Sequence, residues 1–121
     1  MGEGQGRKRY DLEDRTLAFA RRVRVFVKLL PQTLANREDV KQLVRASASV
    51  GANYIEANEA LSKRDFRMRV KTARKEGSES RFFLRLVDTG GEPSADAERA
   101  ALVQEATELC RIFGAILEKS R

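Results

Sequence analysis

Hydrophobic residues recur along most of this chain at steps of three and four residues, which is the period of an α-helix. The first such segment ends at Pro31, because a proline ring keeps the preceding residue out of helical angles. Its apolar seam consists of Leu12, Thr16, Phe19, Val23, Phe26 and Leu30. The pattern predicts a helix over residues 11–30.

Three further segments have the same period and predict helices over residues 37–61, 63–88 and 95–119. The expected seams are Val40, Val44, Ser47, Gly51, Tyr54, Asn58 and Leu61, then Phe66, Val70, Ala73, Gly77, Ser80, Leu84 and Val87, and finally Leu102, Ala106, Leu109, Phe113 and Ile116. No segment alternates with the period of two that a half-buried strand requires.

Residues with short polar side chains stand where these helices should begin. Asn36 is the expected N-cap of the second helix and Ser94 that of the fourth. Ser62, followed three residues later by Asp65, resembles a capping box and predicts the start of the third.

Four helices with short connections predict an all-α protein, an antiparallel up-and-down four-helix bundle. The bundle should span residues 10–121, because a chain of 121 residues has the size of one domain. Residues 1–9 are rich in glycine and basic side chains and are expected to form a flexible tail.

The stretch from Leu43 to Ile55 holds one charged residue, Arg45, in a chain of which 35% is charged. Small residues surround almost every side of this stretch, so helices can approach it on more than one face. We expect it to pack within its own subunit and against a second copy, where Arg45 and Glu56 could pair across an antiparallel interface. The candidate oligomer-interface residues are Arg45, Ser47, Ser49, Gly51, Asn53, Tyr54 and Glu56.

Two single residues have structural interpretations. Gly77 lies inside the third expected helix, where glycine costs about 1 kcal/mol relative to alanine, so we expect a close helix crossing there, over Tyr54 or Phe83. Cys110 is the only cysteine, which excludes an internal disulfide, and it is expected to be a buried thiol.

Positive charge concentrates in two segments, because residues 7–31 hold eight basic and three acidic side chains and residues 61–85 hold nine and three. In the second segment six cations fall on one side of the helix and cover roughly 30 Å at about 1.5 Å per residue. These six, here called the basic stripe, are Arg64, Arg67, Lys71, Arg74, Arg81 and Arg85. The candidates in the first segment are Arg15, Arg21, Arg22 and Lys28.

A row of cations of this length could contact the phosphates of RNA or DNA. The alternative is an ordinary solvated face, with arginines paired to Glu76, Glu79 or the acidic fourth helix. Phe82 and Phe83 are expected in the core, so base stacking is not indicated, and shape and charge should dominate over sequence in any binding.

Little in the sequence favours an enzyme. Histidine is absent, which removes the commonest general base and the nitrogen ligands of metal-binding bundles, so no catalytic residue, metal or cofactor is expected. No apolar run is long enough to span a bilayer and the N-terminus lacks a secretory signal, so we expect a cytoplasmic protein without a membrane partner.

Four sequence segments resemble the four-helix-bundle proteins encoded in intervening sequences of bacterial 23S rRNA genes. The resemblance runs from Tyr10 to Leu117, and its most specific part is the stretch SVGANY that begins at Ser49. The segments are Tyr10 to Arg15, Arg45 to Ala57, Ser62 to Phe66, and Lys75-Glu76 with Phe83 to Leu86. The chain departs from the family pattern at Gly77-Ser78, which leaves a gap in the basic stripe, and at Phe83.

This resemblance implies a left-handed bundle that assembles into a ring-like homopentamer and is not an enzyme. The family is similar to accessory proteins of diversity-generating retroelements, which bind nucleic acid and a reverse transcriptase. We therefore expect a non-enzymatic homo-oligomer that binds RNA or DNA electrostatically through the first and third helices. The alternative is a scaffold or adaptor for a protein partner, such as a reverse transcriptase, without direct nucleic-acid binding.

Overall fold

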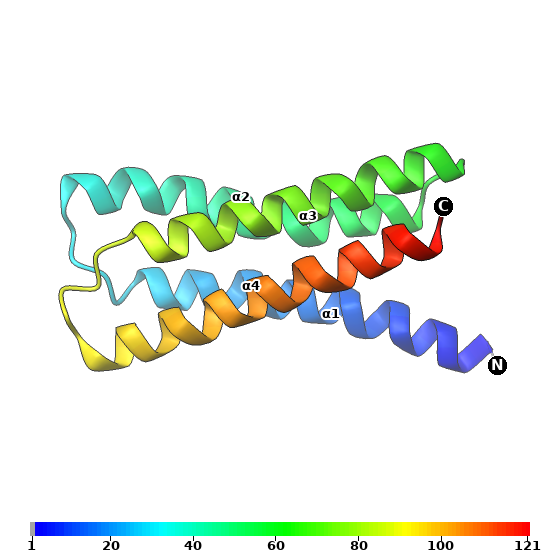
Figure 1. Cartoon of the computed structure of the whole chain (residues 1–121). Coiled ribbons are helices and arrows are strands. Elements are labelled where there is room, and N and C mark those ends of the chain that lie inside the picture. The colour runs from blue at the N-terminus through cyan, green and yellow to red at the C-terminus, as the bar shows by residue number, and fades with distance from the viewer. Residues whose placement is uncertain (1) are drawn as a thin grey trace.

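The computed structural model describes residues 2–121, with side chains from Leu12 onward. It consists of α1 (Gly2–Val27), α2 (Leu34–Asn58), α3 (Lys63–Leu86) and α4 (Pro93–Lys119). The chain reverses direction at each connection, so α1 begins and α4 ends at the same end of the bundle (Figure 1). No strand occurs within residues 2–121. The expected all-α fold of four helices is confirmed.

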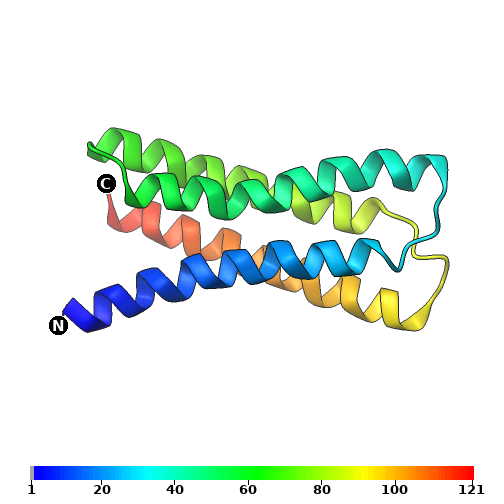
Figure 2. The ribbon, with the colours of Figure 1, turned by 180° about the vertical axis from the view of Figure 1, so that it is seen from behind.

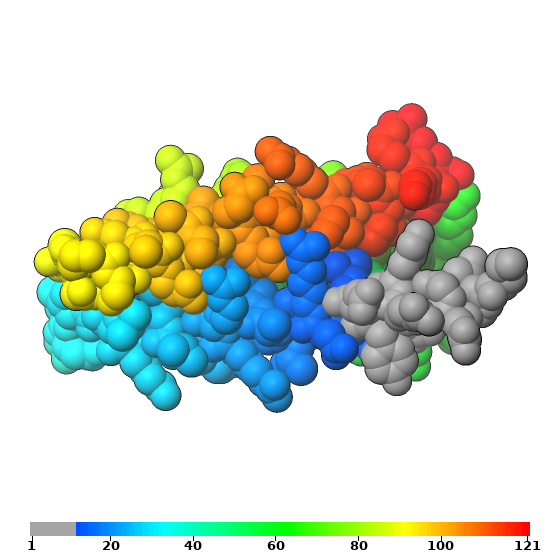
Figure 3. All heavy atoms as spheres, turned by 90° about the horizontal axis from the view of Figure 1, so that it is seen from below, coloured from blue at the N-terminus to red at the C-terminus, as the bar shows by residue number. Residues whose placement is uncertain are grey.

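The helices occupy the corners of a square in chain order. The contact between α2 and α3 is the most extensive, followed by that between α3 and α4. α1 has fewer contacts with α2 and fewest with α4. Among the described residues, no backbone contact joins the diagonal pairs α1 with α3 and α2 with α4. The two opposite views show the same arrangement (Figures 1 and 2). From below, α1 and α4 lie side by side, and side chains of α1 extend onto α4 (Figure 3). The left-handed twist of the bundle stays a prediction.

The core follows the seams expected for α1, α3 and α4. Phe19, Val23 and Phe26 of α1 are fully buried, and the rings of Tyr54 and Phe113 meet at the centre with centroids 5.9 Å apart. The buried seam residues of α3 and α4 are Val70, Ala73, Gly77, Ser80, Leu84, Leu102, Ala106, Leu109 and Phe113. No helix among residues 2–121 is long and apolar enough to cross a membrane.

The seam expected for α2 is partly wrong. Its deepest side chains include Leu43, Ala46 and Val50, which are fully buried and were not assigned to the seam. α2 ends at Asn58, so Leu61 lies beyond the helix and is completely exposed, at 101% of its reference area. The apolar centre of this helix is therefore rotated from the expected position.

Two of the three expected N-caps also need correction. The hydroxyl of Ser62 accepts the amide of Asp65 at 3.0 Å, as expected, but α2 is capped by Thr33. The amide group of Asn36 is instead buried and joins two loops: its nitrogen donates to the carbonyls of Pro31 and Asp88 at 2.9 and 2.8 Å.

The fourth helix begins two residues earlier than expected. The N-cap is Glu92, whose carboxylate accepts the amides of Ser94 and Ala95 at 3.1 Å each and the Ser94 hydroxyl. Pro93 occupies the first helical position, where its missing N–H costs nothing. Ser94 is therefore inside the helix and is not its cap.

A close crossing at Gly77 is present, but with a different neighbour. A Cβ at this position would lie 2.9 Å from the Sγ of Cys110 on α4, so α3 crosses α4 and not Tyr54 or Phe83. Cys110 is half-buried between the two helices, 3.5 Å from the carbonyl of Arg74, and not enclosed in the core.

The expected flexible tail, residues 1–9, falls on a segment of which little is described. The bounds of α1 begin at Gly2, Met1 lies outside the described residues, and so do the side chains before Leu12. The tail therefore stays a prediction.

Candidate nucleic-acid interface

The basic stripe follows the solvent side of α3. Lys71, Arg74 and Arg85 are exposed there, while the opposite side of the helix carries Val70 and Leu84 into the core. The helix has one exposed side and one buried side because residues three, four and seven apart lie on the same side of a helix. The cap at Ser62 starts α3 immediately before the stripe, so its first cation, Arg64, lies in the first turn.

Two arginines of the stripe lie across α4 and bind neutral acceptors there. The Nη1 of Arg67 donates to the carbonyl of Leu117 at 2.6 Å and to the hydroxyl of Ser120 at 2.8 Å. The Nη1 of Arg81 donates to the hydroxyl of Thr107 at 3.4 Å. These contacts fix the two side chains without neutralising their charge.

No carboxylate among the described side chains lies in ion-pair distance of the six residues of the stripe. Glu76 and Glu79, the acids expected to pair with them, are instead bound by Arg45 of α2, whose Nη1 lies 3.3 Å from Oε1 of Glu76 and whose Nη2 bonds Glu79. The hydrogen bond that Arg45 donates to Glu76 is the main cause that raises the pKa of Arg45. The stripe therefore keeps its positive field.

Two of the four cations expected on α1 belong to a different arrangement. Arg15 donates two hydrogen bonds to Glu105 of α4, from Nε to Oε2 at 2.7 Å and from Nη2 to Oε1 at 2.8 Å. Its Nη2 also donates to Oε1 of Glu108 at 2.9 Å. Arg22 binds Glu98 in the same way, at 3.2 and 3.0 Å.

These bonds raise the pKa of both guanidinium groups, chiefly through the hydrogen bonds that Arg15 donates to Glu105 and Arg22 donates to Glu98. Arg15 and Arg22 thus form ion pairs that join α1 to α4, and their assignment to a nucleic-acid surface stays a prediction. Arg21 and Lys28, the other two candidates on α1, are exposed and have no ion pair with a described side chain.

One surface residue was missed by the sequence analysis. Phe82, expected in the core, is 57% exposed on α3, while its neighbour Phe83 is half-buried against the core. The two rings meet edge to face, with centroids 5.2 Å apart and planes at 84°. The signal available in the sequence was that Phe82 lies one helical turn before Leu86, on the side of the stripe and opposite the seam.

The candidate oligomer interface divides into inner and outer residues. Ser47, Gly51 and Tyr54 are buried within the single chain, and their assignment to an interface between copies stays a prediction. Ser49 and Asn53 are half-buried and Glu56 is exposed.

Arg45, Ser49 and Asn53 also make bonds within the chain. Arg45 pairs with Glu76 and Glu79 of its own chain, and the expected pairing with Glu56 of a second copy stays a prediction. The side chains of Ser49 and Asn53 each donate to the carbonyl four residues earlier, at 2.9 Å.

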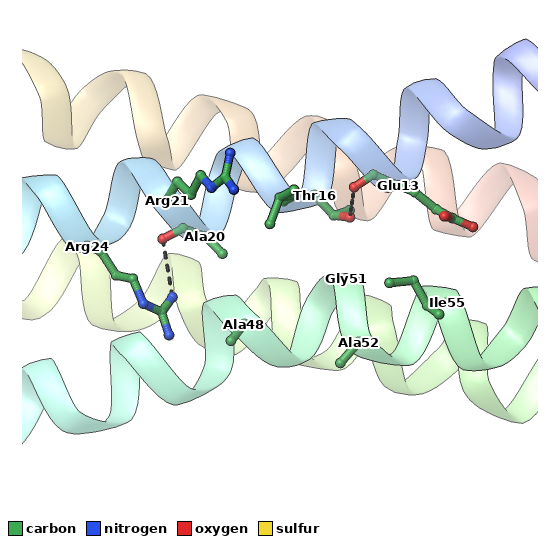
Figure 4. Close-up of a pocket in the computed structure, with 10 residues that line it drawn as sticks. Glu13, Thr16, Ala20, Arg21, Arg24, Ala48, Gly51, Ala52 and Ile55 are labelled. Carbon is green, nitrogen blue, oxygen red and sulfur yellow. Dashed lines mark hydrogen bonds between the residues drawn. The ribbon is translucent and has the colours of Figure 1, made fainter.

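The outer surface of this region contains an apolar groove of about 460 Å³ between α1 and α2 (Figure 4). Gly51 forms its floor, where a Cβ would come within 2.8 Å of Oγ1 of Thr16 and force the helices apart. Leu17 and Ile55, each about half exposed, flank it. The groove, called here the α1–α2 groove, is lined by Glu13, Thr16, Leu17, Ala20, Arg21, Arg24, Ala48, Gly51, Ala52 and Ile55.

Among the described side chains, no group of three or more acidic or thiol residues could hold a metal ion. The carboxylates that do come together, Glu105 with Glu108 and Glu76 with Glu79, bind arginines.

Comparison with known proteins identifies a family and similar solved structures. Residues 8–115 match the family model described as 23S rRNA-intervening sequence protein. The chain is also similar to a crystal structure, at 1.70 Å resolution, of a protein of unknown function from the S23 ribosomal protein family of Bacteroides thetaiotaomicron VPI-5482. That similarity has 28% sequence identity and a TM-score of 0.72, and covers 88% of this chain and 97% of the other. No curated protein matches the chain.

Proposed function

The chain belongs to the family of 23S rRNA-intervening sequence proteins, and from that premise we propose that it is a non-enzymatic protein that binds RNA or DNA through the basic stripe of α3. The resemblance found in the sequence is thereby confirmed for the family. Neither that family description nor the description of the structural neighbour names an enzymatic activity.

The observation that carries the proposal is the contrast between the two basic helices. On α1, Arg15 and Arg22 are neutralised by carboxylates of α4. On α3, the nearest acids are taken by Arg45, and the arginines that reach α4 bind only a carbonyl and hydroxyls. A row of cations without acidic neighbours keeps a positive surface potential, which attracts an external polyanion.

Anchoring on α4 also suits phosphate binding. A guanidinium carries five N–H donors, so Arg67 and Arg81 retain donors after bonding α4. Because the contacts to α4 already restrict these side chains, less conformational entropy is lost when a phosphate binds. Lys71 and Arg85 supply mobile charges on the exposed side of the same row.

We further propose that the protein is a homo-oligomer, as the pentameric ring implied by family resemblance requires, and that the α1–α2 groove is buried between copies. The support is the groove itself: apolar walls flanked by half-exposed Leu17 and Ile55, on the two helices that pack over Gly51. Assembly would repeat the basic stripe once per subunit and multiply the phosphate contacts.

The same groove favours the second candidate function, an adaptor that binds a protein such as a reverse transcriptase. An apolar protein interface would depend little on salt, whereas phosphate contacts release counterions and weaken steeply as salt rises. Salt dependence therefore separates the two functions.

The test is a pair of charge-reversal variants measured by fluorescence anisotropy on short RNA and DNA from about 50 to 300 mM salt. Lys71→Glu with Arg85→Glu alters the stripe at exposed positions, so the fold should be unaffected. Arg37→Glu with Lys41→Glu is the matched control, because it makes the same change in net charge on the exposed start of α2.

We expect the stripe variant to lose at least about tenfold in affinity and to reduce the log–log salt slope on duplex DNA by about 2, since each phosphate contact contributes about 0.9. The control should keep the slope of the unmodified protein. Equal losses in both variants would reduce the effect to net charge. Absence of binding by the unmodified protein at about 50 mM salt would leave the adaptor function in its place.

A further inference from the structure

We propose that Phe82 is a base-stacking platform within the basic stripe, so that the nucleic acid bound by α3 is single-stranded or contains unpaired nucleotides. This inference rests on the proposed function and specifies its ligand. The occupant to which it commits is a short single-stranded segment of RNA or DNA, whose phosphates meet the cations and whose base meets the ring.

The first support is the exposure of Phe82 beside a ring that already fills the core position. Phe82 is 57% exposed, and it leans edge to face on Phe83 at a centroid distance of 5.2 Å. An exposed phenyl ring costs solubility and contributes little to this core, because Phe83 on the adjacent position supplies the packing. The contact with Phe83 restricts the orientation of the exposed ring.

The second support is the presence of exposed cations before and after Phe82 on the surface of α3. Lys71 lies eleven residues earlier, which is three helical turns, and Lys75 lies seven residues earlier. Arg85 lies three residues later, and all three cations are exposed. An aromatic ring between cations along one groove or face is the arrangement by which proteins bind single strands, through phosphate contact and base stacking.

The position of Phe82 also accounts for the gap in the basic stripe between Arg74 and Arg81. Ser78, the position at which a seventh cation is missing, lies one turn before Phe82 and is exposed. A serine leaves space beside the ring, whereas a long arginine there would cover it. The break in the row of cations is therefore the place where a base can lie on Phe82.

The charge of this surface argues for a nucleic acid and against a protein partner. An apolar protein contact needs a broad patch, but Phe82 and its exposed neighbour Leu86 form a small apolar island on the same helix as the exposed cations Lys75 and Arg85. A perfect duplex would offer its phosphates to the cations but no base face to the ring, because its bases are stacked on one another. A single strand satisfies both kinds of group.

The first experiment uses the absence of tryptophan from the chain. Phe82→Trp introduces one indole at the proposed platform, and Leu34→Trp introduces one at an exposed position at the start of α2, outside the basic stripe. Titration with a single strand of about 12 nucleotides should quench the first indole and leave the second unchanged. A duplex of the same length should quench neither.

The second experiment compares the affinities of Phe82→Ala and Leu86→Ala for the same two oligonucleotides at about 100 mM salt. Leu86 is the matched control, because it is about as exposed as Phe82 and lies one turn away, but has no aromatic face. Phe82→Ala should weaken single-strand binding about 5- to 100-fold, the range found when stacking aromatics are removed, and should leave duplex binding within about twofold. Leu86→Ala should change neither.

Each outcome decides between the alternatives. Unchanged single-strand affinity in Phe82→Ala, or equal losses on single strand and duplex, would overturn the stacking platform while leaving the basic stripe in place. A fall in assembly mass by light scattering would overturn it by showing that Phe82 contacts a second copy. Failure of the proposed function is seen separately, as normal binding by the Lys71→Glu and Arg85→Glu variant.

Discussion

At the scale of single residues, the thiol of Cys110 explains why position 77 is a glycine. Glycine inside a helix costs about 1 kcal/mol relative to alanine, so its presence needs a local reason. Among the described residues, and apart from its two chain neighbours and the backbone of its own helix, a Cβ built at this position meets the Sγ of Cys110, at 2.9 Å. The thiol thus occupies the space that an alanine methyl would fill.

A double-mutant cycle tests this pairing. Gly77→Ala alone should destabilise the fold, because the overpacking cost of about 1 to 3 kcal/mol exceeds the gain in helix propensity. In a Cys110→Ala background the same substitution should stabilise by about 0.5 to 1 kcal/mol. The measurement is the free energy of unfolding in urea for the four proteins of the cycle.

Gly114→Ala serves as the control for that cycle, since its nearest neighbour is the Nη1 of Arg74 at 3.9 Å, an ordinary contact. Its effect should be the same with and without Cys110. If Gly77→Ala also has the same effect in both backgrounds, the thiol is not the reason for the glycine.

Phe82 shows where sequence reasoning fails at this scale. The pair Phe82-Phe83 contains two large apolar residues in succession, and adjacent positions on a helix are about 100° apart, so only one of them can face the core. The seam of α3 correctly predicted the burial of Val70, Ala73 and Leu84. Assigning both rings to the core ignored that geometry, and the structure identifies the exposed one.

At the scale of helices, the period of the sequence predicted four elements and their order but not the rotation of each about its own axis. α1 and α3 carry charges on one side, which fixes their inner face. α2 holds one charged residue between Leu43 and Ile55, so several seams fit its sequence equally well, and the expected one was rotated from Leu43 and Ala46. Small residues that allow close packing on many sides also erase the pattern that would orient the helix.

Long-range pairs between helices were beyond prediction for a different reason. Arg15 and Glu105 are 90 positions apart in sequence, and any of several acids on α4 could have met either basic helix. Net charge by segment was correct, but the partner of each cation depends on which helices are neighbours at which height. For this reason the sequence could not show that Arg15 and Arg22 of α1 pair with acids of α4, whereas the basic stripe of α3 has no carboxylate partner among the described side chains.

The start of α4 gives a prediction about pH. The hydroxyl of Ser94, followed by the amides of Ala95 and Ser94, lowers the pKa of Glu92 below its ordinary value of 4.5. A carboxylate with a lowered folded pKa contributes stability above its unfolded pKa and loses it as the pH falls through the folded value. The first turn of α4 should therefore fray below about pH 4.5.

Amide chemical shifts and exchange rates by NMR from about pH 6 to pH 3 measure this fraying at Ser94 and Ala95. Glu92→Gln should remove the titration, because the amide oxygen accepts the same bonds without ionising. The internal control is the backbone N–H of Asn36, which donates to the hydroxyl of the non-ionising cap Thr33 at 3.1 Å. A matching titration at Asn36 would assign the change to the whole fold and not to the Glu92 cap.

At the scale of the whole molecule, charge and apolar surface are separated. Among the described side chains, the six cations of the basic stripe on α3 have no carboxylate in ion-pair distance, Glu98, Glu105 and Glu108 of α4 are bound by α1, and the open apolar groove lies between α1 and α2. The basic stripe and the α1–α2 groove therefore lie on different helices. A bundle that assembles through the groove would leave every copy of the stripe open to a ligand.

The last prediction separates assembly from folding and from nucleic-acid binding. Ile55→Glu places a charge in the α1–α2 groove at a half-exposed position, so each bundle should stay folded while copies part, because an unpaired carboxylate is costly to bury between them. Light scattering should then give the mass of a single chain, 13.7 kDa, with unchanged helicity by circular dichroism. Leu61→Glu, at a fully exposed position outside the groove, should keep the mass of the unmodified protein.

Loss of assembly should also weaken nucleic-acid binding although every cation of the stripe is intact, because joined stripes bind one strand with a higher effective concentration than separate ones. The variant should keep the binding of one subunit and lose only the gain from multivalency, so its salt slope should fall toward that of a single stripe. An Ile55→Glu protein that retains its mass would exclude the groove as the contact between copies. One that loses its mass but binds as strongly as before would show that a single α3 face is the complete binding site.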